Sequence, residues 1–170
     1  EIMRRVVGGG VCLRVSEVHR DGRQLRIGGQ ELWTGLLGRF TAYKLVAVYG
    51  AAVLLGLDRG EVLRVLSTLH PVSGRFEIIR AENGTVAVVD YAHTPNALRN
   101  VIDTINELRN GAGRLIVVVG CGGDRARTKR PVMAQIALEG ANLALLTPDH
   151  PRHEDPAALL AEITAGRTPP

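Results

Sequence analysis

The feature that most constrains the fold is an uninterrupted apolar run followed at once by glycines and then by cations. Residues 115–119 read Leu-Ile-Val-Val-Val, and such a short β-branched run is typical of a strand buried on both faces of a parallel sheet. Gly120, Gly122 and Gly123 then allow the backbone to turn sharply and to approach a ligand closely. Since ligands of open α/β sheets bind beyond the carboxyl ends of the strands, the segment predicts a ligand-binding loop.

The loop after this strand is rich in charge. Its charged residues are Asp124, Arg125, Arg127, Lys129 and Arg130. Guanidinium groups bind carboxylates and phosphates through forked hydrogen bonds, so the loop suits an anionic ligand. The alternative is a solvated turn before a helix that begins at Pro131, and spacing does not decide between the two. The loop is not a dinucleotide fingerprint, because Arg125 replaces the third glycine, and no Gly-Lys-Ser/Thr phosphate loop occurs in the chain.

Composition narrows the class of protein and of partner. With 170 residues, of which 45% are hydrophobic, the chain can bury a core of its own. No apolar run approaches the ~20 residues that span a bilayer, so we expect a cytoplasmic protein without a membrane partner. Cys12 and Cys121 lie too far apart to suggest a zinc site or a disulfide framework. A net charge of +4 with only 4% aromatic residues favours small anionic substrates over nucleic acid, and we expect a monomer.

The first part of the chain predicts hairpin strands and then two helices. Residues 11–15 and 24–27 alternate in polarity, and the turn residues Asp21-Gly22 and Gly28-Gly29 separate these segments, as in an antiparallel sheet. Residues 40–57 change to a helical period. Asp58 and Glu61 then predict a capping box at the start of a second helix. The expected apolar stripe of the first helix is Leu45, Val46, Tyr49, Val53 and Leu54.

From about Gly74 the pattern alternates strand and helix. Residues 76–79 and 85–89 flank Asn83-Gly84, which predicts a two-residue hairpin turn. Thr94 and Pro95 are suited to the N-cap and first position of a helix.

The organising strand comes next and begins a second alternation. A helix is expected at 131–139, a buried strand at 142–147 that is broken by residues 148–152, and a last helix starting at Asp155-Pro156. This order predicts the α/β class with a Rossmann-like, mostly parallel sheet. We expect the chain to be a piece of a longer protein whose sheet has further strands.

Polar groups follow three of the expected strands, and parallel neighbours would open them on one rim. Asp90 immediately after a strand suits a ribose hydroxyl, the alternative being a helix-capping turn. Asp149, His150, His153 and Glu154 suggest a metal site only weakly, because prolines break any helix that would place the histidines on one face.

Four motifs, taken in their order and spacing, resemble the Mur ligases of peptidoglycan synthesis, and in particular the diaminopimelate-adding members. The motifs are Asp-Tyr-Ala-His-Thr-Pro at 90–95, Gly-Cys-Gly-Gly-Asp-Arg at 120–125, Lys-Arg-Pro at 129–131 and Asp-His-Pro-Arg at 149–152. The resemblance implies that residues 1–73 are the C-terminal part of a central ATP-binding domain. Residues 74–170 would be the N-terminal part of the family's C-terminal domain.

The resemblance also implies a function. In this family ATP phosphorylates a substrate carboxylate, and the amine of an amino acid attacks the acyl phosphate. By resemblance Arg75 would reach the nucleotide phosphates and Asp90 the ribose, with His93 and Lys44 in the same site. Arg125, Asp149, His150 and Arg152 would bind diaminopimelate.

The resemblance places other parts of the enzyme outside this chain. The family's phosphate-binding loop, its carbamylated lysine and its Mg²⁺ ligands all lie upstream of residue 1. We therefore expect neither a catalytic nor a metal-ligating residue here, and no activity from the chain alone.

The chain departs from the family pattern at several positions. Thr41 and Lys44 stand where asparagines are usual, Ala126 where an acid is common, and His150 where the Asp-x-Pro-Arg motif has asparagine. An amide can both donate and accept toward a purine, whereas Lys44 can only donate. Two alternatives stay open: a folylpolyglutamate synthetase-type ligase, which should lack the Asp-x-Pro-Arg motif, and a diverged scaffold without catalytic activity.

Overall fold

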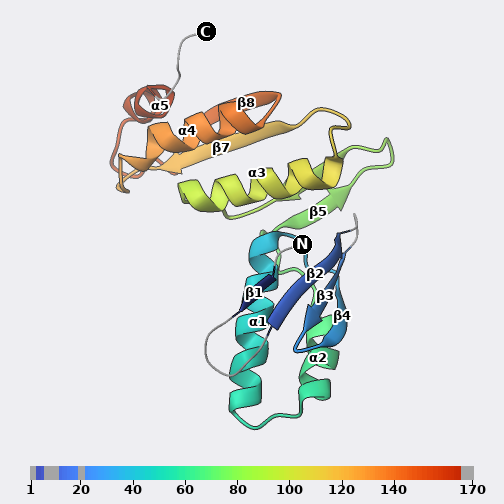
Figure 1. The fold of residues 1–170 in the computed structure, drawn as a ribbon. Coiled ribbons are helices and arrows are strands. Elements are labelled where there is room, and N and C mark those ends of the chain that lie inside the picture. The colour runs from blue at the N-terminus through green and yellow to red at the C-terminus, as the bar shows by residue number, and fades with distance from the viewer. Residues whose placement is uncertain (1–2, 6–11, 19–21, 166–170) are drawn as a thin grey trace. The chain divides into compact units, whose positions relative to one another are not determined.

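The computed structural model of the chain describes residues 3–5, 12–18 and 22–165 (Figure 1). The chain divides into two compact units, Glu1–Tyr91 and Ala92–Pro170, and each is described by itself below. Both units combine strands with helices, and the second contains a parallel strand pair, which confirms the predicted α/β class. The domain boundary expected between residues 73 and 74 stays a prediction.

The first unit begins with an antiparallel sheet in the order β1-β2-β3-β4. Its strands are β1 (Met3–Arg5), β2 (Cys12–Val18), β3 (Arg23–Ile27) and β4 (Gln30–Thr34). Gly28 and Gly29 have φ values of 59° and 88°, the left-handed region that a two-residue hairpin turn requires at both positions. The predicted hairpin pattern is therefore confirmed here, while the Asp21 turn residue lies outside the described part.

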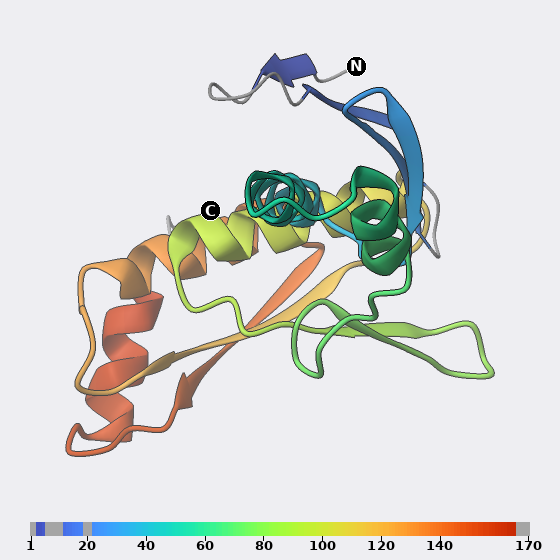
Figure 2. The ribbon, with the colours of Figure 1, turned by 90° about the horizontal axis from the view of Figure 1, so that it is seen from below.

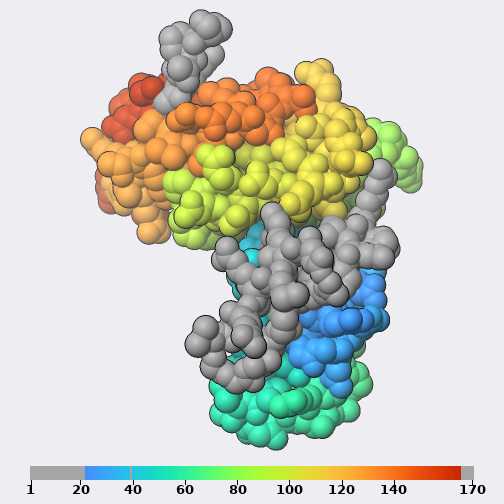
Figure 3. Space-filling view, viewed as in Figure 1, coloured from blue at the N-terminus to red at the C-terminus, as the bar shows by residue number. Residues whose placement is uncertain are grey.

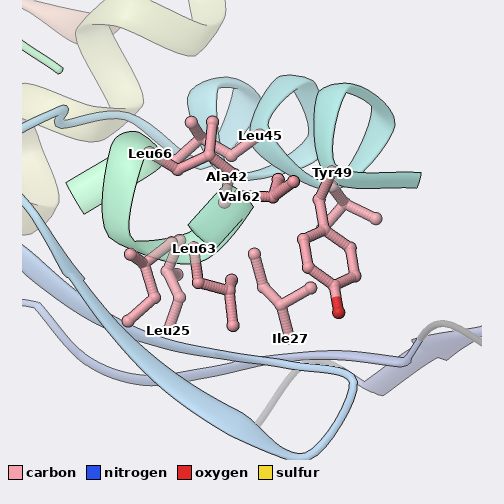
Figure 4. Close-up of a cluster of buried hydrophobic side chains, with 10 residues drawn as sticks. Leu25, Ile27, Ala42, Leu45, Tyr49, Val62, Leu63 and Leu66 are labelled. Carbon is pink, nitrogen blue, oxygen red and sulfur yellow. The ribbon is translucent and has the colours of Figure 1, made fainter. Parts of the chain in front are cut away.

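Helices α1 (Arg39–Leu54) and α2 (Arg59–Ser67) contribute the other half of this unit's core. Figure 4 shows their apolar side chains directed at those of the sheet. The core consists of Leu25, Ile27, Leu32, Ala42, Leu45, Val46, Tyr49, Val62, Leu63 and Leu66. The predicted stripe is correct except at Leu54, which ends α1 and is 81% exposed.

The capping box at the start of α2 is only half formed. The Asp58 carboxylate accepts a hydrogen bond from the Glu61 amide at 3.0 Å, as predicted. The Glu61 carboxylate, however, accepts from the Arg64 guanidinium at 2.9 Å. The i,i+3 ion pair on the helix surface therefore engages the glutamate side chain that the box would have used.

The hairpin of β5 (Glu77–Arg80) and β6 (Val86–Val89) corrects one turn prediction. Its loop has three residues, not two, because Ala81 still pairs with Thr85 at 2.9 Å. The Gly84 amide donates to the Ala81 carbonyl at 3.1 Å, and Gly84 has a φ of 83°. A turn closed in this way and followed by a left-handed glycine is the common three-residue hairpin loop.

The second unit alternates helix and strand throughout. Its elements are α3 (Pro95–Arg109), β7 (Ile116–Gly122), α4 (Lys129–Gly140), β8 (Leu143–Asp149) and α5 (Pro156–Thr164). Strands β7 and β8 are parallel, and helices α3 and α4 lie side by side on one face of them (Figure 1, Figure 2). On the face drawn in Figure 3 this unit forms one continuous surface.

Local signals set the helix starts of this unit. The Thr94 hydroxyl accepts from the Ala97 amide at 3.3 Å, and the Asp155 carboxylate accepts from the Ala158 amide at 2.9 Å. Both helix starts were predicted, the first with Thr94 as its cap, and in each case proline follows the cap. Helix α4 begins at Lys129, two residues before the predicted start at Pro131, and β8 runs through Pro148 instead of ending before it.

The prediction that the organising strand is buried on both faces is wrong. Val119 and Cys121 are buried against the helices, and burial raises the pKa of the Cys121 thiol. Ile116 and Val118 on the other face are 54% and 67% exposed. The described helices that pack against β7 and β8 share one core with the buried face alone.

Helix α5 is attached to its unit through the fully buried Leu159. We expect Leu159→Ala to lower the free energy of unfolding by about 2–5 kcal/mol, because it leaves a cavity between α5 and the rest of the core. The matched change Leu138→Ala, at a position 41% exposed on α4, should cost less than about 1 kcal/mol. Urea denaturation of both variants measures this, and equal losses would contradict the packing described.

Candidate functional site

The candidate site is built on two loops that leave the same end of the parallel strand pair. The β7–α4 loop spans residues 123–128, and the β8–α5 loop spans residues 150–155. They are adjacent because Gly122 pairs with Asp149 at the carboxyl ends of the strands. The expectation that these two polar loops share one rim is therefore confirmed.

The two loops touch each other through backbone. The Gly123 amide donates to the His150 carbonyl at 3.1 Å. A Cβ atom at position 123 would clash with the Pro151 carbonyl oxygen. The glycine is thus required by close approach of the other loop, a reason that the sequence alone did not identify.

Three residues of these loops hold an unfavourable backbone conformation. Asp124, His150 and Arg152 have φ values of 52°, 40° and 56°. Left-handed conformations at residues other than glycine are uncommon and persist where surrounding contacts enforce them. Their concentration in the two loops indicates that the loop shapes are fixed by specific contacts.

Arg130 supplies the most extensive of those contacts. Its side chain is fully buried although it carries a charge. Its guanidinium donates to both oxygens of the Glu154 carboxylate at 2.8 Å, to Glu162 Oε2 at 2.6 Å and to the Gly122 carbonyl at 3.2 Å. A charge can be buried only when it is paired in this way.

Glu154 is the partner that joins the two loops. Its Oε1 also accepts from the Asp124 amide at 2.6 Å, and Arg127 approaches its Oε2 at 3.4 Å. The Arg130 hydrogen bonds, with the Asp124 amide, lower the pKa of Glu154 from 4.5 to about 2. The hydrogen bonds that Arg130 donates to the same carboxylate raise the pKa of Arg130.

Sequence reasoning considered Glu154 only as a weak metal ligand and named Arg130 only among the charged residues of its loop and in the Lys-Arg-Pro motif. The structure gives Arg130 a supporting role in which Glu154 and Glu162 are its partners, and this pairing was not anticipated. A usable signal was present: an arginine in the first turn of a helix needs carboxylates nearby if it is buried, and these two acids are available in the next loop and helix.

The remaining cations of the loops are exposed. Within the described residues, neither Arg125 nor Arg152 has a hydrogen bond or an ion pair. The Asp149 and His150 side chains are 62% and 88% exposed, with 3.9 Å between His150 Nε2 and an Asp149 carboxylate oxygen. Two guanidinium groups without protein partners in the described part of the chain lie on neighbouring loops. Each can bind a ligand carboxylate by donating forked hydrogen bonds to it.

The residues predicted to bind nucleotide do not gather in one unit. Lys44, Arg75 and Asp90 belong to the first compact unit, and His93 belongs to the second. Lys44 Nζ lies 5.2 Å from the centroid of the Phe40 ring. The His93 carbonyl accepts from Lys129 Nζ at 2.8 Å, which ties the start of α4 to the loop before α3.

Asp90 has a structural contact that the sequence did not indicate. Its Oδ2 accepts from the Phe76 amide at 2.8 Å, and Phe76 is held at a φ of 50°. Its Oδ1 has no hydrogen bond within the described residues. One carboxylate oxygen is therefore used for support and the other is available.

The loop that carries Arg75 is fixed by Glu77, a residue that was also not anticipated. The Glu77 carboxylate accepts from the Gly74 amide at 2.7 Å and from the Ser73 hydroxyl at 2.9 Å, and these bonds lower its pKa. The Arg75 guanidinium lies 4.7 Å from the centroid of the Tyr91 ring. This arrangement leaves the cation exposed on an ordered turn.

The described residues contain no group of three or more potential metal-ligating side chains. We therefore assign no step to a metal held by these residues. In the same part of the chain, no helix is both long enough and apolar enough to cross a bilayer.

Residues 74–169 match the family described as Mur ligase, glutamate ligase domain. The chain is 51% identical over 155 residues to the UDP-N-acetylmuramoyl-L-alanyl-D-glutamate–2,6-diaminopimelate ligase of Parabacteroides distasonis, covering 91% of this chain and 32% of the relative. The ligase of the same name from Bacteroides thetaiotaomicron is 47% identical over 153 residues, covering 90% and 32%. The chain thus spans about a third of the length of these relatives.

The chain also resembles solved structures of ligases. A structure of a UDP-N-acetylmuramoyl-L-alanyl-D-glutamate–2,6-diaminopimelate ligase is 38% identical with a TM-score of 0.55, covering 88% of this chain and 31% of that one. A folylpolyglutamate synthase from Thermotoga maritima has a TM-score of 0.70 at 18% identity, covering 91% and 37%. At that identity the second likeness concerns the fold alone.

The close contact at Gly123 generates a stability prediction. We expect Gly123→Ala to lower the free energy of unfolding by about 1–3 kcal/mol, because the new methyl group must push the β8–α5 loop away. Gly50→Ala is the matched control: no atom lies within 4 Å of a Cβ there, and alanine favours helix α1 by up to ~1 kcal/mol. Denaturant titration distinguishes them, and two variants that both gain stability would contradict the loop contact.

The low pKa of Glu154 generates a pH prediction. The ionised carboxylate stabilises the fold fully above its usual pKa of 4.5, and this contribution is lost as the pH falls toward about 2. The difference in unfolding free energy between the wild type and Glu154→Gln should therefore shrink across this range. Urea titrations in steps of pH measure it, and a difference that stays constant from pH 5 to about pH 2 would show that Glu154 is not paired as described.

Proposed function

We propose that this chain, which belongs to the Mur ligase family, is part of an ATP-dependent amide ligase that adds diaminopimelate to UDP-N-acetylmuramoyl-L-alanyl-D-glutamate. The family match and the 51% identity to a relative of that name support the assignment. The reaction would serve the synthesis of peptidoglycan precursors. We further propose a monomer that acts on small molecules in the cytoplasm.

The proposed reaction has two steps. ATP transfers its terminal phosphoryl group to the glutamate carboxylate, which gives an acyl phosphate and ADP. The amine of diaminopimelate then attacks the acyl carbon, so that an amide bond forms and inorganic phosphate leaves. Because the sequence has no Gly-Lys-Ser/Thr loop, we expect this chain alone not to carry out the first step.

The observation that carries the proposal is the pair of exposed guanidinium groups on adjacent loops. Arg125 and Arg152 have no protein partners within the described residues, and both loops are held in strained, fixed shapes. Diaminopimelate differs from lysine by a second carboxylate at its far end. A permanently charged, planar cation pair is suited to recognise that group, with Asp149 and His150 beside it.

We propose that the second group of residues contacts the nucleotide. Asp90 Oδ1, which has no other partner among the described residues, would accept from a ribose hydroxyl, while Oδ2 supports Phe76. Arg75 on its fixed turn would reach the phosphates, and Lys44 of the same unit would also contact the nucleotide. Asp90→Ala would therefore disturb structure as well as binding, and Asp90→Asn is the cleaner probe.

A second candidate is a diverged scaffold without turnover, and one observation favours it. Thr41 lacks the side-chain amide usual in the family, and its hydroxyl donates a hydrogen bond to the Leu37 carbonyl at 2.8 Å. Lys44 cannot accept a hydrogen bond either. A folylpolyglutamate synthetase-type activity receives less support, since that likeness is one of fold and Asp149-His150-Pro151-Arg152 retains the Asp-x-Pro-Arg motif.

The test is a chimera in which this chain replaces the matching segment of the Parabacteroides distasonis relative. We expect phosphate release that depends on diaminopimelate, with lysine a poor substitute. Arg152→Ala removes one charge-assisted contact worth about 1.5–3 kcal/mol, and kcat/KM for diaminopimelate should fall about tenfold to a hundredfold. The matched variant Arg64→Ala removes an exposed guanidinium on α2 and should leave kcat/KM unchanged.

Two results would contradict the proposal. A chimera that folds but releases no phosphate with diaminopimelate would favour the scaffold. An active chimera whose preference for diaminopimelate over lysine survives Arg152→Ala would show that the Asp-x-Pro-Arg motif does not recognise the second carboxylate.

A further inference from the structure

One carboxylate joins the two loops of the candidate site in addition to the backbone contact between Gly123 and His150. Both oxygens of Glu154 bond to Arg130, which comes from α4, and Oε1 also accepts from the Asp124 amide of the β7–α4 loop at 2.6 Å. Glu154 itself belongs to the β8–α5 loop, where its amide donates to the Pro151 carbonyl at 3.0 Å. A single side chain therefore connects three segments of the unit.

This connection is poorly explained as a source of stability. Desolvating a guanidinium is costly, and a buried ion pair is often no more stable than well-packed apolar residues. What the pair provides is geometry, because a planar fork fixes both the direction and the separation of the groups that it joins. Arg130 adds a bond to the Gly122 carbonyl, at the point where β7 ends.

The fixed groups lie next to the exposed cations. Asp124, which donates its amide hydrogen bond to Glu154, directly precedes Arg125 in the sequence. Arg152 lies two residues before Glu154 in the same loop. Both Asp124 and Arg152 have positive φ values, 52° and 56°, so contacts from elsewhere must hold these backbones in place.

We propose that Arg130 and Glu154 are positioning residues for amino-acid recognition, which fix the β7–α4 loop against the β8–α5 loop so that Arg125 and Arg152 meet the same ligand. This inference rests on the proposed function for the identity of the ligand. Arg130 and Glu154 do not contact the ligand themselves. They act through the Asp124 amide and the Gly122 carbonyl.

Two other side chains near the Arg130–Glu154 pair, Glu162 and His153, are alternatives for holding the loops in place. Glu162 of α5 shares the Arg130 guanidinium at 2.6 Å and approaches the Arg127 guanidinium of the β7–α4 loop at 3.4 Å, but among the described residues it accepts no hydrogen bond from the backbone of that loop. His153 approaches Asp124 Oδ2 at 2.8 Å, yet its side chain is 93% exposed. Solvent competes with the exposed contact, so Glu154 is the principal constraint on Asp124.

The test measures amide hydrogen exchange of this chain by NMR. In Glu154→Ala the exchange rate of the Asp124 amide should rise about tenfold or more, while the buried residues Ile102 and Ala137 keep their protection. Glu154→Gln retains one oxygen that can accept from Asp124 and should give an intermediate rate. Glu61→Ala, which removes an exposed carboxylate paired with Arg64, is the matched control and should change none of these rates.

A localised effect supports positioning. An Asp124 rate that stays at the wild-type value in Glu154→Ala would overturn the proposal, as would a uniform rise that includes Ile102 and Ala137, since that pattern reports general loss of stability.

Calorimetry with meso-diaminopimelate separates this inference from the proposed function. The wild-type chain should bind the amino acid, and Glu154→Ala should weaken binding about tenfold without removing a ligand contact. Equal binding by both forms would overturn the positioning role. If the wild-type chain does not bind diaminopimelate, the proposed recognition site fails, while hydrogen exchange at Asp124 still decides whether Glu154 fixes the loops.

Discussion

The fork between Arg130 and Glu154 is the interaction on which the candidate site depends. A charge that is fully removed from water must be paired, and here the pairing consumes both oxygens of one carboxylate. Glu154 also accepts a hydrogen bond from the Asp124 amide. The pairing of Arg130 with Glu154 therefore fixes the course of two loops. The strained backbones at His150 and Arg152 occur in one of the loops so fixed.

The parallel strand pair prepares this arrangement. Gly122 and Asp149 are opposite each other, so the chain leaves both strands at one rim, and Gly123 lets the loops approach to backbone contact. Arg125 and Arg152 are then presented without protein partners of their own among the described residues. Arg130 is buried and paired, whereas Arg125 and Arg152 are exposed, and this difference separates support from recognition.

Much of the fold could be predicted because its signals are local. The caps at Thr94 and Asp155 need only a side-chain oxygen and an amide three residues later, and both helix starts were predicted correctly. The site was less predictable, because burial of Arg130 and its partnership with Glu154 depend on residues 24 positions apart. The predicted burial of Val118 was wrong for a similar reason. The pattern of residues indicates a strand, but it does not indicate what packs on each face of that strand.

The most direct test of the account is a crystal structure of the chain with meso-diaminopimelate. The account predicts one carboxylate of the ligand within hydrogen-bonding distance of both Arg125 and Arg152, with the Arg130 to Glu154 bonds and the Gly123 to His150 contact unchanged. A ligand bound elsewhere, or bound here only after the two loops separate, would contradict it.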